Sequence, residues 1–197
     1  MFSSYNFDQS ENDPQNYYYY SEGFTKEELD KIDKGISILK QDKAVTAGGG
    51  DDSVRSSKIR WIPQDNEWWW LYEKLSGYIT TANKSLWNFD LKSIPEQIQF
   101  TEYYATEKGH YTWHQDIGPG ILSKRKISIT VQLSDPSEYE GGVLEMWSGG
   151  NQDTAINAYK GAGSVFIFPS YMMHRVTPVT KGVRKSFVLW VGGSHYK

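Results

Sequence analysis

The sequence predicts a mainly β fold of the jelly-roll or barrel type with flanking helices. From Gln97 onward, short runs rich in β-branched and aromatic residues alternate with Gly, Pro, Asp and Ser, and no helical pattern lies between them. Aromatic residues make up 15% of the chain, and they favour β-sheets. Evenly spaced short strands are typical of jelly rolls and barrels. The eight runs are Ile98–Ala105, His110–Gln115, Lys126–Leu133, Gly142–Trp147, Thr154–Ala158, Ser164–Phe168, Met172–Val176 and Lys185–Val191.

Two helices are expected before these strands. Thr25 and Glu28 form the pattern of a capping box, which predicts a helix that continues to Leu39. Asp65 is expected to cap a second helix. The apolar residues of this second helix fall on one face, and they are Trp68, Leu71, Tyr72, Leu75 and Ile79. Between the helices, the Gly-rich stretch 47–53 predicts a loop that is either a plain connector or a flap over a site.

The 197 residues predict one domain. We expect a poorly ordered N-terminal segment over 1–20 and a single domain over 21–197. Within the domain, helical support covers about 25–90 and the jelly-roll core about 97–193.

Composition narrows the possible functions. The formal net charge is −3 and no basic stripe is present, so nucleic-acid binding is not favoured. No apolar run approaches the roughly 20 residues that span a bilayer, and Met1–Tyr20 does not resemble a signal peptide. A cytoplasmic protein is therefore expected. Because the chain has no cysteine, any metal must bind histidine and carboxylate side chains.

Three residues form a candidate metal site. His114 and Asp116 are two positions apart at the end of one predicted strand, so their side chains point to the same face. His174 follows on a later strand. Two histidines and one carboxylate are the ligands that hold Fe(II) and leave open positions, which a bidentate 2-oxo acid and O2 can occupy. Taken alone, the His114–Asp116 pair would more often be a hydrogen-bonded pair on a strand surface than a metal site.

Three further polar residues are candidates for binding a ligand of this metal. Arg184 lies ten residues after His174 and can grip a distant carboxylate with two hydrogen bonds. Ser186, two positions on, faces the same way and offers a hydroxyl donor. Tyr104, ten residues before His114, is expected to reach the same ligand with its phenol, and barrel packing is the alternative.

Two stretches carry a resemblance to a known family. They are Ser128–Gly142 and His174–Arg184, and both look like the prolyl/lysyl-hydroxylase-like (PKHD-type) branch of the Fe(II)/2-oxoglutarate dioxygenases, which is similar to prolyl 4-hydroxylases. The resemblance covers roughly 97–193. It implies a double-stranded β-helix, a cupin-like jelly roll.

The resemblance also implies site residues. His114, Asp116 and His174 would ligate Fe(II), and Arg184 would pair with the far carboxylate of 2-oxoglutarate. Tyr104 and Ser128 would hydrogen-bond the co-substrate, and Gln132 would line the same pocket. Because related halogenases lack the carboxylate ligand, Asp116 favours hydroxylation.

The expected activity is hydroxylation of an unactivated C–H, with release of succinate and CO2. The substrate would be a prolyl or other side chain of an amino acid, peptide or protein, and ascorbate is a possible addition to Fe(II), 2-oxoglutarate and O2. One alternative is a non-catalytic cupin-like module that binds a metal and a small acid. Another is a metal-dependent hydrolase or isomerase, which usually uses more histidines. The oligomeric state stays open.

Overall fold

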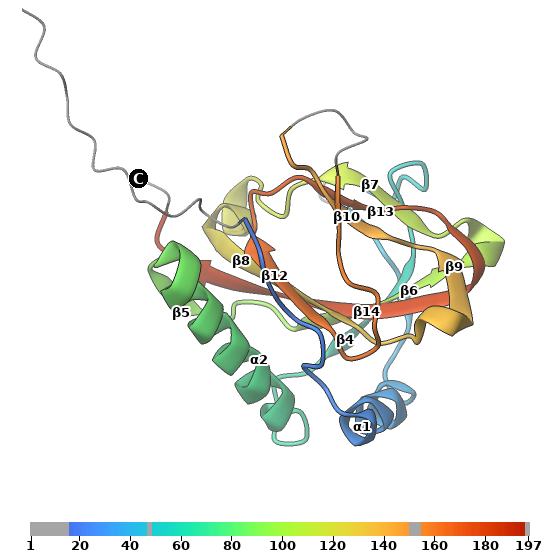
Figure 1. Ribbon diagram of the computed structural model, residues 1–197, viewed down its shortest axis with the longest axis horizontal. Coiled ribbons are helices and arrows are strands. Elements are labelled where there is room, and N and C mark those ends of the chain that lie inside the picture. The colour runs from blue at the N-terminus through green and yellow to red at the C-terminus, as the bar shows by residue number, and fades with distance from the viewer. Residues whose placement is uncertain (1–15, 47–48, 150–154, 196–197) are drawn as a thin grey trace, which may run out of the picture.

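Two antiparallel β-sheets face each other and enclose the interior of the protein (Figure 1). The computed structural model describes residues 16–46, 49–149 and 155–195. The larger sheet has the order β1 (Tyr18–Tyr20), β12 (Val165–Pro169), β8 (Arg125–Gln132), β14 (Val179–Gly193), β6 (Ile98–Tyr104), β4 (Lys58–Ile62) and β2 (Asp42–Lys43). Two further strands pair with β14: β5 (Leu91–Ser93) and β9 (Tyr139–Gly141). The smaller sheet has the order β11 (Ile156–Asn157), β10 (Leu144–Met146), β13 (His174–Val176), β7 (His110–His114) and β3 (Arg55–Ser56).

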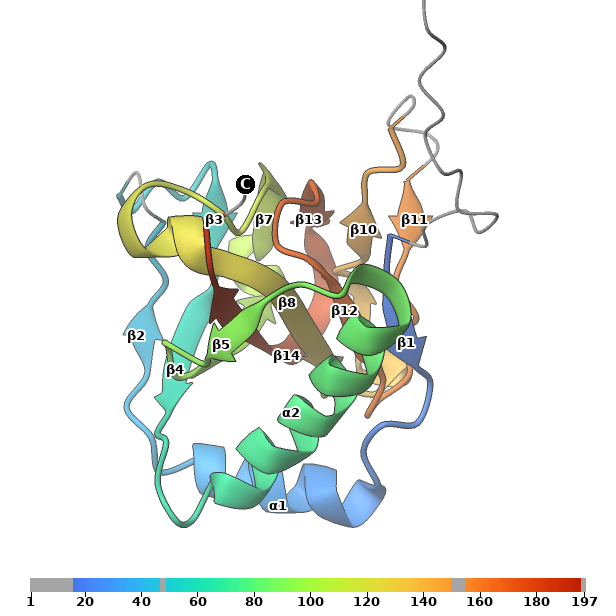
Figure 2. The same cartoon turned by 90° about the vertical axis from the view of Figure 1, so that its left-hand side faces the viewer.

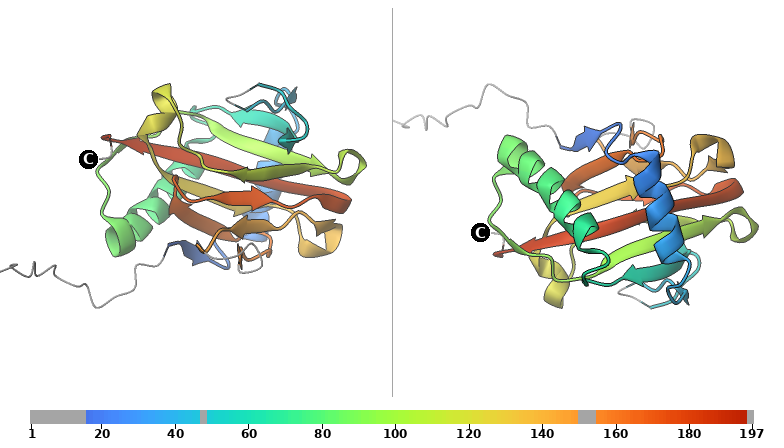
Figure 3. Two further views of the ribbon diagram at one scale, coloured as in Figure 1. Left: turned by 90° about the horizontal axis from the view of Figure 1, so that it is seen from above. Right: turned by 90° about the horizontal axis from the view of Figure 1, so that it is seen from below.

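The helices α1 (Lys26–Ile36) and α2 (Trp69–Ala82) lie across the outer face of the larger sheet (Figures 2 and 3). A five-residue π-helical turn, Asn83–Trp87, continues α2. The predicted capping box of α1 is present, with Thr25 accepting from the Glu28 N–H and Glu28 accepting in return. Asp65 accepts from the N–H groups of Glu67 and Trp68, so it caps the turn that precedes α2.

Apolar side chains on both sides of the larger sheet form two cores. One core joins the sheet to the helices, and it includes Ile32, Leu71, Leu75, Phe100 and Ile129. The other lies between the sheets, and it includes Leu144, Met146, Phe168 and Val176. Because strand side chains alternate between faces, each strand of the larger sheet contributes one set to the helices and one to the space between the sheets. The predicted mainly β architecture with flanking helices is confirmed.

Some boundaries differ from the sequence predictions. The predicted run Gly142–Trp147 is shorter in the structure, where β10 covers Leu144–Met146 and Gly142 has a positive φ of 55°. The last strand begins earlier than Lys185, at Val179. β1 lies inside the segment 1–20 that was set apart from the domain, and it pairs with β12. Residues 1–15, 47–48 and Thr154 of the predicted strand 154–158 fall outside the described residues.

Short 3-10 turns connect several of the strands. They are Ala105–Glu107, Gly120–Lys124 and Pro136–Glu138. The second of these lies in the loop that follows Asp116. None of the described helices has the length and apolar character that crossing a membrane requires.

Candidate active site

A cavity of about 50 Å³ lies between the two sheets. Its walls come from both sheets, so residues far apart in the sequence meet there. The polar lining residues are Arg55, Gln99, Thr101, Tyr103, Tyr111, His114, Asp116, Thr130, His174, Arg184, Ser186 and Trp190. Four apolar side chains complete the lining: Leu144, Phe168, Val176 and Val188.

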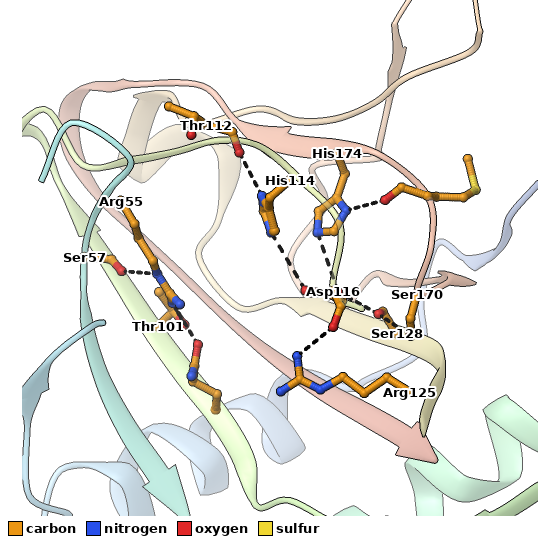
Figure 4. A network of polar contacts seen from close by, with 12 residues as sticks. Arg55, Ser57, Thr101, Thr112, His114, Asp116, Arg125, Ser128, Ser170 and His174 are labelled. Carbon is orange, nitrogen blue, oxygen red and sulfur yellow. Dashed lines mark hydrogen bonds and ion pairs between the residues drawn. The ribbon is translucent and has the colours of Figure 1, made fainter. Parts of the chain in front are cut away.

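The structure brings the three predicted metal ligands together at this cavity (Figure 4). His114 and His174 are paired across β7 and β13, and Asp116 lies two residues beyond the end of β7. The distance from Asp116 Oδ1 to His114 Nε2 is 3.8 Å, and that from Asp116 Oδ2 to His174 Nε2 is 3.6 Å. One ion bound about 2.1 Å from each atom can bridge such gaps. The donor set therefore fits a first-row metal that accepts imidazole and carboxylate ligands, such as Fe(II).

Backbone hydrogen bonds orient both imidazoles for metal binding. Nδ1 of His114 lies 2.8 Å from the Thr112 carbonyl oxygen, and Nδ1 of His174 lies 2.9 Å from that of Met172. A carbonyl oxygen only accepts, so Nδ1 carries the proton in each ring. The Nε2 lone pair is then left for the metal.

The charge states also suit a cation. Burial lowers the pKa of His114 to about 3, with the neighbouring His174 adding to the effect and Asp116 opposing it. Burial raises the pKa of Asp116, but the two imidazoles and the Ser128 hydroxyl outweigh it, and the net shift is downward. At neutral pH the site thus offers a neutral His114 and an ionised carboxylate, the forms that bind metal.

Ser128 holds Asp116, which differs from its predicted role. Its hydroxyl donates to Asp116 Oδ2 at 2.6 Å and lies 3.0 Å from the Ser170 hydroxyl. Ser128 is fully buried and does not line the cavity. The carboxylate of Asp116 thus uses the one proton of the Ser128 hydroxyl, and the contact of Ser128 with the co-substrate stays a prediction.

Arg125 supports the same ligand from the other side. Its Nη1 donates to the Asp116 carbonyl oxygen at 3.1 Å, and its Nε and Nη2 donate to the Glu96 carboxylate at 2.7 and 2.5 Å. A bidentate pair of this kind fixes the guanidinium plane. Glu96 and Arg125 thus hold the backbone of Asp116 in place.

Replacing Ser128 with alanine is expected to weaken metal binding about tenfold, because a carboxylate ligand loses the hydrogen bond that orients it. Titration with Mn(II) under anaerobic conditions measures the change. Ser76→Ala, on the outer face of α2, is the matched control and should bind metal as the wild type does. Equal affinities for Ser128→Ala and the wild type would show that the hydroxyl does not position Asp116.

Arg184 and Ser186 both line the cavity, as their two-residue spacing on β14 predicted. Arg184 is 4% exposed, and its Nη1 donates to Ser186 Oγ at 3.1 Å. None of the ion pairs among the described residues includes Arg184. A buried guanidinium without a carboxylate is costly, and an anionic ligand in the cavity would compensate it.

Gly142 makes room for the Arg184 side chain. A Cβ added at Gly142 would lie 2.9 Å from Arg184 Cδ and 2.9 Å from Val179 Cγ2. Its φ of 55° is also in the left-handed region.

We therefore expect Gly142→Ala to lower the free energy of unfolding by about 1–2 kcal/mol and to displace Arg184. Chemical denaturation measures the first effect. Gly77→Ala is the control, because Gly77 lies within α2 with no atom near its added Cβ, and it should gain about 0.5–1 kcal/mol. A Gly142→Ala variant as stable as the wild type would contradict the predicted clash.

The structure places Tyr104 outside the cavity and Tyr103 in its wall. On β6, Gln99, Thr101 and Tyr103 face the cavity, whereas Tyr104 lies under Lys58, whose Nζ is 4.6 Å from the ring centroid. The expected orientation of Tyr104 was wrong by one position. The reason is the 3-10 turn Ala105–Glu107 between β6 and β7, across which strand alternation does not carry over.

Gln132 lies next to this cavity rather than in it. It lines a smaller adjoining cavity, and its amide nitrogen donates to the Ser134 carbonyl oxygen at 3.2 Å. Arg184 lines both cavities.

One wall of the cavity was not predicted from the sequence. Arg55 is buried, its Nε donates to Ser57 Oγ at 2.9 Å, and its Nη2 donates to Gln99 Oε1 at 2.7 Å (Figure 4). Its guanidinium carbon lies 4.8 Å from the Tyr111 ring centroid. No ion pair among the described residues includes Arg55, and its hydrogen-bond partners are the neutral side chains of Ser57, Gln99 and Thr101. It comes from the two-residue strand β3, which has no recognisable pattern in the sequence.

Comparison with known proteins shows which family the chain belongs to. The family model for the 2OG-Fe(II) oxygenase superfamily matches residues 98–192, the segment that contains the three candidate ligands and Arg184. The chain belongs to this superfamily. Within the superfamily it is similar to PKHD-type hydroxylases. It is 31% identical to one from Acidovorax ebreus over 161 residues, which cover 77% of this chain and 66% of the relative.

A PKHD-type hydroxylase from Nitrosomonas europaea is 35% identical over 112 residues, which cover 52% of this chain and 48% of the relative. The chain thus spans about half the length of that curated relative.

Solved structures of the superfamily share the fold. A prolyl hydroxylase from Trichoplax adhaerens, solved with a peptide fragment of the hypoxia inducible factor oxygen degradation domain, has a TM-score of 0.73 at 16% identity. The match covers 90% of this chain and 84% of that one. A prolyl-4-hydroxylase from Pseudomonas putida has a TM-score of 0.69 at 16% identity, covering 90% and 92%. The predicted double-stranded β-helix is confirmed.

Proposed function

We propose that this protein is an Fe(II)- and 2-oxoglutarate-dependent dioxygenase that hydroxylates an unactivated C–H of an amino-acid side chain. The observation that carries the proposal is one cavity lined by two histidines, one carboxylate and a buried arginine without a carboxylate partner. In the overall reaction, R–H, 2-oxoglutarate and O2 give R–OH, succinate and CO2. When bound, Fe(II) would supply the oxidative chemistry that cleaves O2.

Each residue then has a role. His114, Asp116 and His174 would hold the iron, and a ligand set of two histidines and one carboxylate would leave positions for other ligands. Arg184 would bind the far carboxylate of 2-oxoglutarate, with Ser186 holding its guanidinium. The apolar side chains of Leu144, Val176 and Val188 would exclude water from the reacting groups.

The substrate proposed is a prolyl or similar side chain in a peptide or protein. Support comes from the relatives named above, two of which are prolyl hydroxylases by name. Arg55 supports a substrate with an oxygen acceptor, because its guanidinium faces the cavity and its partners are neutral. A peptide carbonyl or a carboxylate would suit it.

Turnover tests the proposal directly. The protein is incubated with Fe(II), 2-oxoglutarate, O2 and ascorbate, and with a panel of proline-containing peptides and free amino acids. We expect succinate in amounts that match the hydroxylated product. If the protein binds Fe(II) and 2-oxoglutarate yet releases no succinate with any panel member, a non-catalytic binding module becomes the better account.

A further inference from the structure

A second, smaller cavity adjoins the triad cavity at Arg184. Its volume is about 10 Å³, enough for one water-sized group. Thr130, Leu144 and Arg184 line both cavities, so the two are neighbours separated by the guanidinium and these side chains. Tyr139 and Lys160 belong to the smaller cavity alone.

Tyr139 carries a buried hydroxyl whose proton meets no acceptor. The residue is 4% exposed, and its hydroxyl donates to no acceptor within the described part of the chain. Burial raises the pKa of Tyr139, and the positive charge of Arg184, together with a hydrogen-bonding contact from the same guanidinium, opposes this rise. The phenol is therefore a protonated donor at neutral pH, and it lies close to the guanidinium.

The backbone explains why these two groups are side by side. β9 pairs with β14, with Tyr139 opposite Gly182. A Cβ added at Gly142 would lie 2.9 Å from Arg184 Cδ and 3.3 Å from Tyr139 Cε2, so the arginine stem and the tyrosine ring both contact this glycine. The two side chains thus run along the same glycine into the same region.

The charges nearby favour an anion. Lys160 adds a second cation, with its Nζ 5.7 Å from the Tyr139 ring centroid and 3.3 Å from the Gly141 carbonyl oxygen. Gln132 is less free to bind the same group, because one of its two amide N–H donors is already bonded to the Ser134 carbonyl oxygen.

We propose that the Tyr139 hydroxyl donates a hydrogen bond to the far carboxylate of 2-oxoglutarate, beside Arg184, and so makes the site selective for 2-oxo diacids. A carboxylate oxygen between the phenol and the guanidinium satisfies both donors at once. This inference rests on the proposed function, since it concerns how the same co-substrate is held.

The test compares two 2-oxo acids that share the metal-binding end. 2-Oxoglutarate has a far carboxylate and pyruvate has none. Each is titrated calorimetrically into Mn(II)-loaded protein without O2, so that binding is measured apart from turnover. Tyr139→Phe is expected to weaken 2-oxoglutarate binding about tenfold and to leave pyruvate binding unchanged. Tyr19→Phe, at an exposed tyrosine of β1, is the matched control and should change neither affinity.

A second variant shows whether Tyr139 and Arg184 hold the same group. If they do, adding Tyr139→Phe to Arg184→Met lowers the affinity for 2-oxoglutarate little further, because Arg184→Met has already removed the other contact. If the losses of binding free energy in the two single variants add fully in the double variant, the proposal is overturned.

The remaining outcomes are equally distinct. An unchanged 2-oxoglutarate affinity in Tyr139→Phe overturns the proposal, and so does an equal loss for both acids, which would indicate a merely structural tyrosine. A larger loss in Gln132→Leu than in Tyr139→Phe would give the contact to Gln132 instead. If the wild type binds neither acid, the proposed function itself fails; if the wild type binds 2-oxoglutarate and Tyr139→Phe binds it equally, only this inference fails.

Discussion

Replacing His174 with alanine is expected to abolish 2-oxoglutarate turnover and to weaken Fe(II) binding at least 1000-fold. His174 is 6% exposed, and its Nε2 lies 3.6 Å from Asp116 Oδ2, so no other described side chain in the cavity can take its place as a nitrogen ligand. Losing one of three protein ligands removes several kcal/mol of the free energy of metal binding. Metal content after anaerobic reconstitution and succinate release measure the two effects.

His110→Ala is the control for this prediction. Both ring nitrogens of His110 lie near backbone carbonyl oxygens, those of Lys108 and Ser53, and the residue does not line the cavity. The His110→Ala variant should keep its metal and its turnover. If His174→Ala released as much succinate as the wild type, the iron site would have to lie elsewhere.

The sequence predicted the parts of the site that depend on strand alternation over a short distance. His114 and Asp116 are two residues apart, and Arg184 and Ser186 are two residues apart on one strand. In an extended chain such pairs share a face whatever the rest of the fold does. All four residues line the same cavity.

The sequence was less informative where a turn or a tertiary partner decides the outcome. Counting back from His114 to Tyr104 crosses a 3-10 turn, and the strand before that turn presents Tyr103 instead. Ser128 points into the interior, and its hydroxyl donates to the carboxylate of Asp116, which itself lines the cavity. Sequence alone does not show which acceptor a buried hydroxyl will meet.

Arg55 and Tyr139 were missed for a different reason. Each belongs to a strand of two or three residues, too short for a recognisable pattern, and reaches the site only through pairing with a distant strand. Contacts of this kind are non-local, so they become visible only when the sheet order is known. β3 joins the smaller sheet at β7, and β9 joins the larger one at β14.

Replacing Arg184 with methionine is expected to weaken 2-oxoglutarate binding about 100-fold or more while leaving the free energy of unfolding unchanged or higher. The far carboxylate would lose its charge-assisted hydrogen bonds. Without co-substrate, the free energy of unfolding should change little. Arg184 has no carboxylate partner among the described residues, and burying an uncompensated cation is unfavourable. Calorimetric titration with 2-oxoglutarate and denaturation by urea measure the two quantities.

Arg60→Met is the control, and the opposite pattern is expected from it. Arg60 pairs with the carboxylate of Glu102 on the outer face of the larger sheet, where Glu102 is mostly buried. Removing Arg60 leaves that carboxylate uncompensated, which should cost a few kcal/mol of stability without changing 2-oxoglutarate affinity. Arg60 would then contribute to stability, and Arg184 to the binding of 2-oxoglutarate. If Arg184→Met destabilised the protein as Arg60→Met does, and bound 2-oxoglutarate as tightly as the wild type, Arg184 would be a structural residue and the co-substrate would have to bind elsewhere.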